Sequence, residues 1–248
     1  MIRKTAMILA IAVLAAGTAS AENIKNRLGL WMGIDTFKMQ ELNDVIGELS
    51  ARILGQEAKP IKAMGGIGLE GGLGISENVM LGVRVGGYKS QVASASLDVP
   101  PIGSAKVSSF ASAVPVMAGF RYLIPIDEKL WAGFGAFGGV ARVIGNITVE
   151  SDVLGVKNTT KMDYAGNAPA VEAILCFDYR ISESISLGGD LGYMGMKANS
   201  IGAVKDYDFD GDGVVDVKKG TKAQNSAGKD AAMDLSGLTI SLGLNLLF

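Results

Sequence analysis

Residues 239–248, the last ten of the chain, read Thr-Ile-Ser-Leu-Gly-Leu-Asn-Leu-Leu-Phe. Every second residue from Ile240 to Phe248 is apolar, and the residues that alternate with them from Thr239 to Asn245 are small or polar. A period of two places the apolar side chains on one face of a β-strand and the polar ones on the other. The chain is therefore predicted to end in a strand with one apolar face.

The same alternation recurs in six segments farther upstream. A seventh segment, 130–143, is so rich in Gly and Ala that its inward and outward faces cannot be assigned. Together with the terminal strand, these segments predict eight strands. The apolar faces of the six alternating segments fall within 28–34, 67–75, 79–85, 114–122, 171–181 and 185–193.

The connections between these segments alternate between short and long. Polar turns of three residues lie at 76–78, 127–129 and 182–184, whereas connections of roughly 37–62, 91–106, 148–163 and 198–232 are expected to be long loops. This pattern is typical of a transmembrane β-barrel with short periplasmic turns and long extracellular loops. We therefore expect an all-β fold, an eight-stranded antiparallel up-and-down transmembrane barrel.

The first 21 residues predict a secretory signal peptide. Arg3 and Lys4 form a short basic region, residues 6–16 are apolar, and Ala19 and Ala21 flank a small-residue cleavage site. The expected division is a signal peptide at 1–21 and an outer-membrane barrel domain at 22–248. Cleavage would leave 21 basic and 25 acidic residues, a balance that predicts no nucleic-acid partner.

The 248 residues include 34 Gly, one Cys and no His. The absence of His excludes Ser-His-Asp triads and His-based metal sites, and a single Cys excludes an intramolecular disulfide. High Gly content argues against a helical bundle, because each Gly inside a helix costs about 1 kcal/mol relative to Ala.

The leader, the eight alternating segments, the polar turns and the terminal Phe248 resemble the small outer-membrane β-barrel superfamily of Gram-negative bacteria, the porin-family, OmpA-like or OmpW-like barrels. The resemblance implies a location in the outer membrane and recognition of Phe248 by the barrel-assembly machinery. It also implies contact with an extracellular ligand through the long loops. Barrel enzymes of the lipase, deacylase and aspartate-histidine protease types depend on His, so we expect no catalysis. Two functions stay open: a structural or surface-interaction barrel, or a narrow channel for small or hydrophobic solutes.

Charged residues fall on the face opposite the apolar one. A bore of eight strands is only wide enough to be filled by side chains, so these charges are expected to pair. They either form a salt-bridged plug or line a narrow solute path. The predicted lumen charge network is Asp35, Glu70, Arg84, Arg121, Glu172, Asp178, Arg180 and Asp190.

An acidic stretch in the last long connection resembles part of an EF-hand calcium loop. Asp208, Asp210, Asp212 and Asp216 have the spacing of loop positions 1, 3, 5 and 9, and Gly213 stands at position 6. Position 12 is Lys219 instead of the bidentate Glu. A weak Ca²⁺ site and a merely hydrated acidic loop both fit this pattern, and we expect no other cofactor.

Residues 38–54 have helical periodicity. Apolar residues such as Leu42, Ile46 and Leu49 recur at helical spacing, with charged residues opposite, which predicts an amphipathic helix in the first long connection. It could cap the barrel mouth, lie at the membrane surface or meet a partner; we favour the cap.

Overall fold

A computed structural model describes residues 25–37, 39–208, 212–224 and 228–248. The predicted leader lies outside these residues. Eight long strands pair antiparallel in the order β1, β2, β3, β5, β6, β7, β8, β11, and β11 pairs with β1 to close the ring. The predicted eight-stranded antiparallel barrel is confirmed. The ring strands are β1 (Arg27–Phe37), β2 (Met64–Gly74), β3 (Val79–Ser90), β5 (Gly103–Pro125), β6 (Leu130–Val153), β7 (Val156–Ser182), β8 (Ile185–Ala198) and β11 (Gly237–Leu247).

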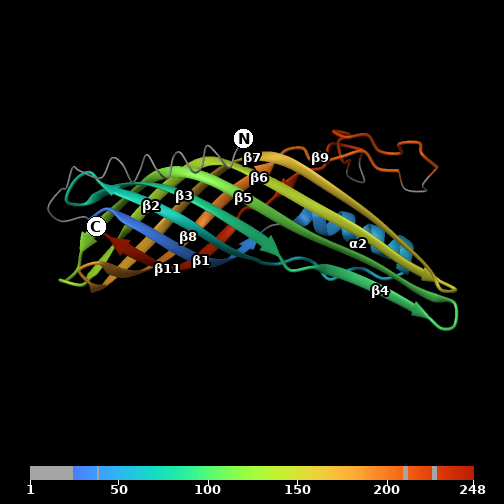
Figure 1. Cartoon of the computed structure of the whole chain (residues 1–248), viewed down its shortest axis with the longest axis horizontal. Helices are drawn as coiled ribbons and strands as arrows, with labels where there is room; N and C mark the ends of the chain where they lie inside the picture. The colour runs from blue at the N-terminus through green and yellow to red at the C-terminus, as the bar shows by residue number, and fades with distance from the viewer. Residues whose placement is uncertain (1–24, 38, 209–211, 225–227) are drawn as a thin grey trace.

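The C-terminal end of the chain lies beside the start of β1, at the end of the barrel that carries the short turns. Leu28 is paired with Leu246, and the Phe248 N–H donates to the Asn26 carbonyl at 3.0 Å. The turns after β2, β5 and β7 lie at this end (Figure 1). An even number of strands places both ends of the ring on the same side.

Three ring strands are far longer than the others and project beyond the barrel. β1, β2 and β11 have 11 residues each, whereas β5, β6 and β7 have 23, 24 and 27. With β4 (Ala93–Val99), which pairs with the start of β5, they form a four-stranded extension that we call the arm (Figure 1).

The arm replaces two of the expected long loops. Residues 91–106 contain β4 and the start of β5, and residues 148–163 continue β6 and β7 around a turn at Leu154 and Gly155, both with positive φ. The sequence predicted loops here because its strands were identified by apolar outward faces. In the arm the apolar side chains lie on the inward face.

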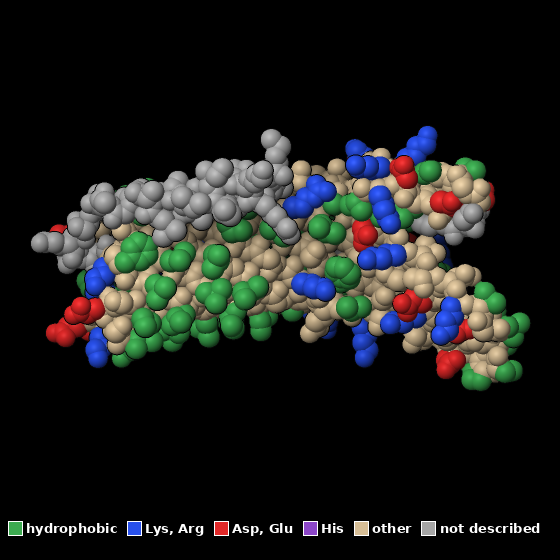
Figure 2. Space-filling view, viewed as in Figure 1, with side chains coloured by type: hydrophobic (Ala, Val, Ile, Leu, Met, Phe, Trp, Pro, Cys, Tyr) green, Lys and Arg blue, Asp and Glu red, His purple; other side chains and the backbone are tan. Residues whose placement is uncertain are grey.

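The outside of the barrel carries a belt of exposed apolar side chains. Ile240 and Leu242 on β11 are each 60% exposed, and Leu175 on β7 is 55% exposed. Figure 2 shows this belt over the barrel half of the visible face, with charged side chains at the short-turn end and on the arm. The structure also assigns the faces of β6: Phe134 and Val140 point outward, whereas Trp131 and Phe137 are buried inside.

The predicted amphipathic helix is present as α2 (Gln40–Leu54) and lies on the inner side of the arm (Figure 1). Leu54 packs with Ala95 of β4 and Val107 of β5, while Ile46 joins the buried cluster at the barrel mouth. The helix ends at Gly55, whose left-handed conformation lets its N–H donate to the Ala51 carbonyl. It therefore covers part of the mouth and part of the arm.

The last connection, between β8 and β11, includes two strands of two residues each. β9 (Gly202–Ala203) pairs with β7, and β10 (Met233–Asp234) pairs with the end of β8. Among the described residues, no helix is long and apolar enough to cross a membrane.

Candidate functional site: a buried ion-pair network in the lumen

Seven charged side chains meet inside the barrel, and we call them the lumen network. Six strands contribute to it, because alternate residues of every strand point inward. The tilt of the strands places residues from different positions along each strand at the same level of the barrel. Each residue except Asp190, which is half-buried, is buried from solvent. The members are Arg27, Glu70, Arg84, Arg121, Glu172, Asp178 and Asp190.

Glu70 is the centre of the network, because three arginines converge on it. Arg121 forms a bidentate pair with it, from Nε to Oε1 at 2.8 Å and from Nη2 to Oε2 at 2.7 Å. Arg27 donates to Oε1, and Arg84 Nε lies 3.1 Å from Oε2. Loss of this carboxylate would leave three guanidinium groups facing one another.

Asp190 and Glu172 hold the other side of the same arginines. Arg121 Nη1 donates to Asp190 Oδ1 at 2.6 Å, and Arg84 Nη2 donates to Asp190 Oδ2 at 3.0 Å. Arg84 Nη1 donates to Glu172 Oε2 at 2.7 Å. Two arginines and three carboxylates are therefore cross-linked, joining β2, β3, β5, β7 and β8 through side chains as well as through the sheet.

A second group of contacts lies closer to the short turns. Arg27 Nη1 donates to Asp178 Oδ2 at 3.0 Å, and the Asn245 side-chain amide donates to Asp178 at 3.4 Å and to Ser186 at 3.2 Å. Arg27 also reaches Glu70, so it connects this group to the centre of the network.

Two aromatic side chains flank Arg84. Its guanidinium carbon lies 5.2 Å from the Trp31 ring centroid and 5.3 Å from that of Phe137, distances typical of cation–π contacts. Trp31 fits because Gly68 and Gly86 face it. A Cβ on either glycine would lie about 2.5 Å from the indole. Gly68 and Gly86 therefore make room for Trp31.

The network fills the bore at its own level. A cavity at its centre has a volume of about 20 Å³, which is enough for about one water molecule, and a second cavity of about 30 Å³ lies beside Arg27 and Asp178. Buried charges that have lost water must be compensated by partners, and here each arginine has at least two carboxylate partners. Such an arrangement favours a packed plug over an open solute path.

Six of the eight residues predicted for the network are brought together, and two lie elsewhere. Asp35 on β1 is buried, with an exposed fraction of 2%, but it forms no ion pair with any described residue. Arg180 lies near the short turns, where its guanidinium carbon is 4.6 Å from the Trp131 ring centroid. Both residues have the expected inward parity, but their height along the barrel separates them from Glu70.

Sequence reasoning missed Arg27, Trp31 and Phe137. Arg27 and Trp31 have the same parity as Asp35, so beginning the first strand at Arg27 would have identified both as inward-facing. Phe137 could not be assigned because the parity of 130–143 depends on its pairing with β5.

The acidic connection is only partly within the described residues. Asp210 lies outside them, whereas Asp208, Asp212 and Asp216 are exposed. Asp208 accepts a hydrogen bond from the Gly213 N–H at 2.9 Å. No group of three or more acidic, Cys or His side chains in the described part of the chain is placed to hold a metal ion. Calcium binding stays a prediction.

Comparisons with known proteins give a likeness in structure alone. No family model matches the chain, and no curated protein matches it. Neisserial surface protein A is 9% identical, covering 90% of this chain and 97% of its own, with a TM-score of 0.42. Ail, the attachment invasion locus protein of Yersinia pestis, is 9% identical over 91% and 99%, also at 0.42. The outer membrane protein OprG of Pseudomonas aeruginosa is 11% identical over 92% and 98%, at 0.44. At these values the likeness assigns no function.

Proposed function

We propose that this protein is an integral outer-membrane barrel with a closed lumen, that it is not an enzyme, and that it has a structural or surface-interaction role carried by its arm. The lumen network supports this proposal most directly. The side chains of the network leave space for about one water at its centre, which supports a lumen that is closed at that level.

The apolar belt supports the location. Soluble monomers rarely expose contiguous apolar patches larger than a few hundred Å². Here the outward residues of the belt are mostly apolar and exposed, and the ring strands pair in a closed sheet, which lets their backbone groups pair as hydrocarbon requires. The predicted leader and the terminal Phe248, 53% exposed beside the short turns, favour the outer membrane.

The arm supports the interaction role. It extends the sheet well past the belt, and its outward face carries charged and polar side chains such as Lys106, Glu150 and Lys161. On the proposed orientation this face lies in the extracellular medium. The sequence contains no His, and the buried charges of the lumen network are held in mutual pairs and not open to a substrate.

Planar-bilayer recording tests the closed lumen. The purified protein in a lipid bilayer should give no steady unit currents, and Arg84→Ala should lower the unfolding temperature without opening a conductance. Steady currents from the unmodified protein would instead support a narrow channel. Cell fractionation tests the location: we expect the protein in the outer-membrane fraction with heat-modifiable migration on a gel, and recovery from the soluble periplasm would refute it.

A further inference from the structure

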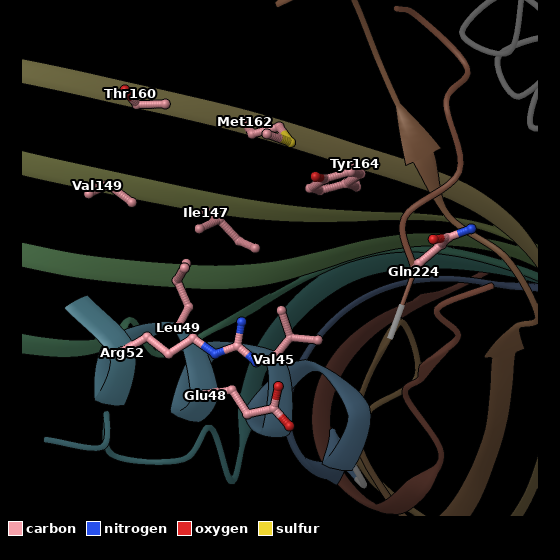
Figure 3. A pocket seen from close by; sticks show the side chains of 10 residues that line it. All are labelled: Val45, Glu48, Leu49, Arg52, Ile147, Val149, Thr160, Met162, Tyr164 and Gln224. Atoms are coloured by element: carbon pink, nitrogen blue, oxygen red, sulfur yellow. The ribbon is translucent and has the colours of Figure 1, made fainter. Parts of the chain in front are cut away.

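The helix covers only part of the inner face of the arm. It packs through Leu54 against β4 and β5, but toward β6 and β7 it leaves a groove with a volume of about 550 Å³ (Figure 3). Val45 and Leu49 of the helix form one wall, and Ile147 and Met162 of the two strands form the other. Both walls are apolar, although this part of the molecule lies beyond the belt.

The groove leads to a smaller apolar chamber near the barrel mouth. The chamber has a volume of about 100 Å³ and shares four lining residues with the groove: Val45, Ile147, Tyr164 and Gln224. Its other walls include Ile201 and Met233. The cavity therefore becomes narrower and more apolar toward the barrel.

An arginine of the helix lines the groove. Arg52 lies in the last turn of α2, and its side chain extends back along the helix toward Val45, while Tyr164 and Gln224 lie at the chamber end (Figure 3). Arg52 forms no ion pair with any residue that the structure describes. The Glu48 carboxylate points away from β6 and β7 (Figure 3). Arg52 is thus a cation in the lining of the groove, one helical turn after Glu48.

We propose that the groove binds a single-chain amphiphile with a carboxylate head group, with the carboxylate at Arg52 and the apolar chain directed toward the chamber. The volume lies within the range of about 300–1,000 Å³ that small-molecule sites occupy. Apolar walls with a few polar groups at the ends suit an elongated ligand with one polar end. A guanidinium binds a carboxylate through charge-assisted hydrogen bonds, which fixes the orientation of the ligand.

The site is separate from the lumen network, so it does not require a conducting barrel. It goes beyond the proposed surface role by giving the arm a ligand of defined chemistry. Closed-lumen and membrane-location tests can succeed or fail without changing the expected binding at the groove.

Photo-crosslinking tests the proposal in the full-length protein reconstituted in lipid nanodiscs. The probe is dodecanoic acid with a diazirine at the end of its chain, and the labelled peptides are mapped by mass spectrometry. We expect saturable labelling of peptides that contain Ile147, Tyr164 or Met233, which unlabelled dodecanoic acid reduces. Labelling confined to belt peptides, or labelling that does not saturate, would overturn the proposal.

Substitutions separate the groove from unspecific lipid contact. Ile147→Trp should fill the groove and abolish the saturable labelling, and Thr160→Trp offers a second way to obstruct it at the rim. Lys161→Trp, on the outward face of the same arm, is the matched control and should leave labelling unchanged. Each variant is first checked for heat-modifiable migration. Unchanged labelling in folded Ile147→Trp and Thr160→Trp would contradict the proposed site.

The head group is tested with Arg52→Gln. Loss of a charge-assisted hydrogen bond should weaken competition by dodecanoic acid by about tenfold or more, and leave competition by dodecanol nearly unchanged. Equal losses for the acid and the alcohol, or no loss for either, would contradict the role of Arg52 as the carboxylate partner.

Discussion

The belt and the arm share the strands β5, β6 and β7, but the apolar side chains lie on opposite faces of these strands in the two regions. On β7, odd-numbered residues point outward throughout: Leu175 and Phe177 are exposed in the belt, and Lys161 is exposed in the arm. Even-numbered residues point inward throughout, with Glu172 in the lumen and Met162 on the inner face of the arm. Strand direction and register do not change between the two regions. The polarity of each face reverses.

With the belt in a membrane, as proposed above, the reversal follows from the surrounding medium. An outward apolar face is stable against hydrocarbon, and it then leaves the inward positions for polar groups that must be paired. An outward face in water is polar, and the inward apolar face needs a cover. In the barrel, the inward polar groups are paired within the lumen network. In the arm, the inward apolar face is covered in part by α2.

The largest expected loss of stability comes from disrupting the lumen network. Glu70→Ala should destabilise the protein by about 3–5 kcal/mol, because it leaves three buried arginines without their shared carboxylate. Unfolding in urea, followed by heat-modifiable migration, measures the change. Glu150→Ala on the arm is the control: its pair with Lys106 is 3.8 Å long and exposed, so the loss should be below about 1 kcal/mol. Similar losses for both variants would contradict a special role for the lumen network.

The next effect tests the outer faces of one strand. Leu175→Arg places a charge on the lipid side of β7 and should cost about 2–4 kcal/mol near the middle of the membrane. Thr159→Arg, on the same face of the same strand in the arm, should change stability by no more than about 0.5 kcal/mol. Both are measured by unfolding from lipid vesicles. A Leu175→Arg variant as stable as Thr159→Arg would show that the belt does not face hydrocarbon.

A smaller effect tests the cover of the arm. Leu54→Ala removes a buried contact with Val107 and should weaken docking of α2 by about 2 kcal/mol, while the barrel keeps its heat-modifiable migration. Faster hydrogen exchange across α2 reports the loss. The neighbouring Ile53 is 43% exposed, so Ile53→Ala should leave exchange nearly unchanged. A loss of barrel stability in Leu54→Ala would mean that arm and barrel unfold as one unit.

The smallest effect lies at the short-turn end of the belt. Backbone N–H groups of Lys129 and Leu130 donate to the Asp127 carboxylate and lower its pKa below the ordinary value of 3.8. A lowered pKa in the folded state means that Asp127 contributes stability above the ordinary value and loses it as the pH falls through the lowered one. Unfolding of Asp127→Ala should therefore show a slight loss at neutral pH that disappears in acid. A loss that persists in acid would point to a cause other than ionisation.

Much of the barrel follows from the sequence because period-two alternation is a local property. Segments such as 239–248 predicted their faces without knowledge of their neighbours, and helical periodicity predicted α2. The strands of the arm were not predicted, because in water the apolar residues of an alternating strand face inward, whereas in lipid they face outward. The sequence alone does not show where a strand would leave the lipid. The parity of 130–143 required pairing with β5, because glycine and alanine carry little polarity.

By itself, the sequence determined that there are eight strands and, for all of them but 130–143, which face is apolar, because that assignment depends on residues two positions apart. Only the tertiary structure decided which charges meet. Glu70 receives Arg27, Arg84 and Arg121 because closure and strand tilt bring three distant segments to one height, while Asp35 and Arg180 have the same parity at other heights. The groove beside α2 likewise exists only once the arm curves past the helix. The sequence of each strand determines which face a side chain lies on. The assembly of the strands determines the height of that side chain along the barrel and which side chains enclose it.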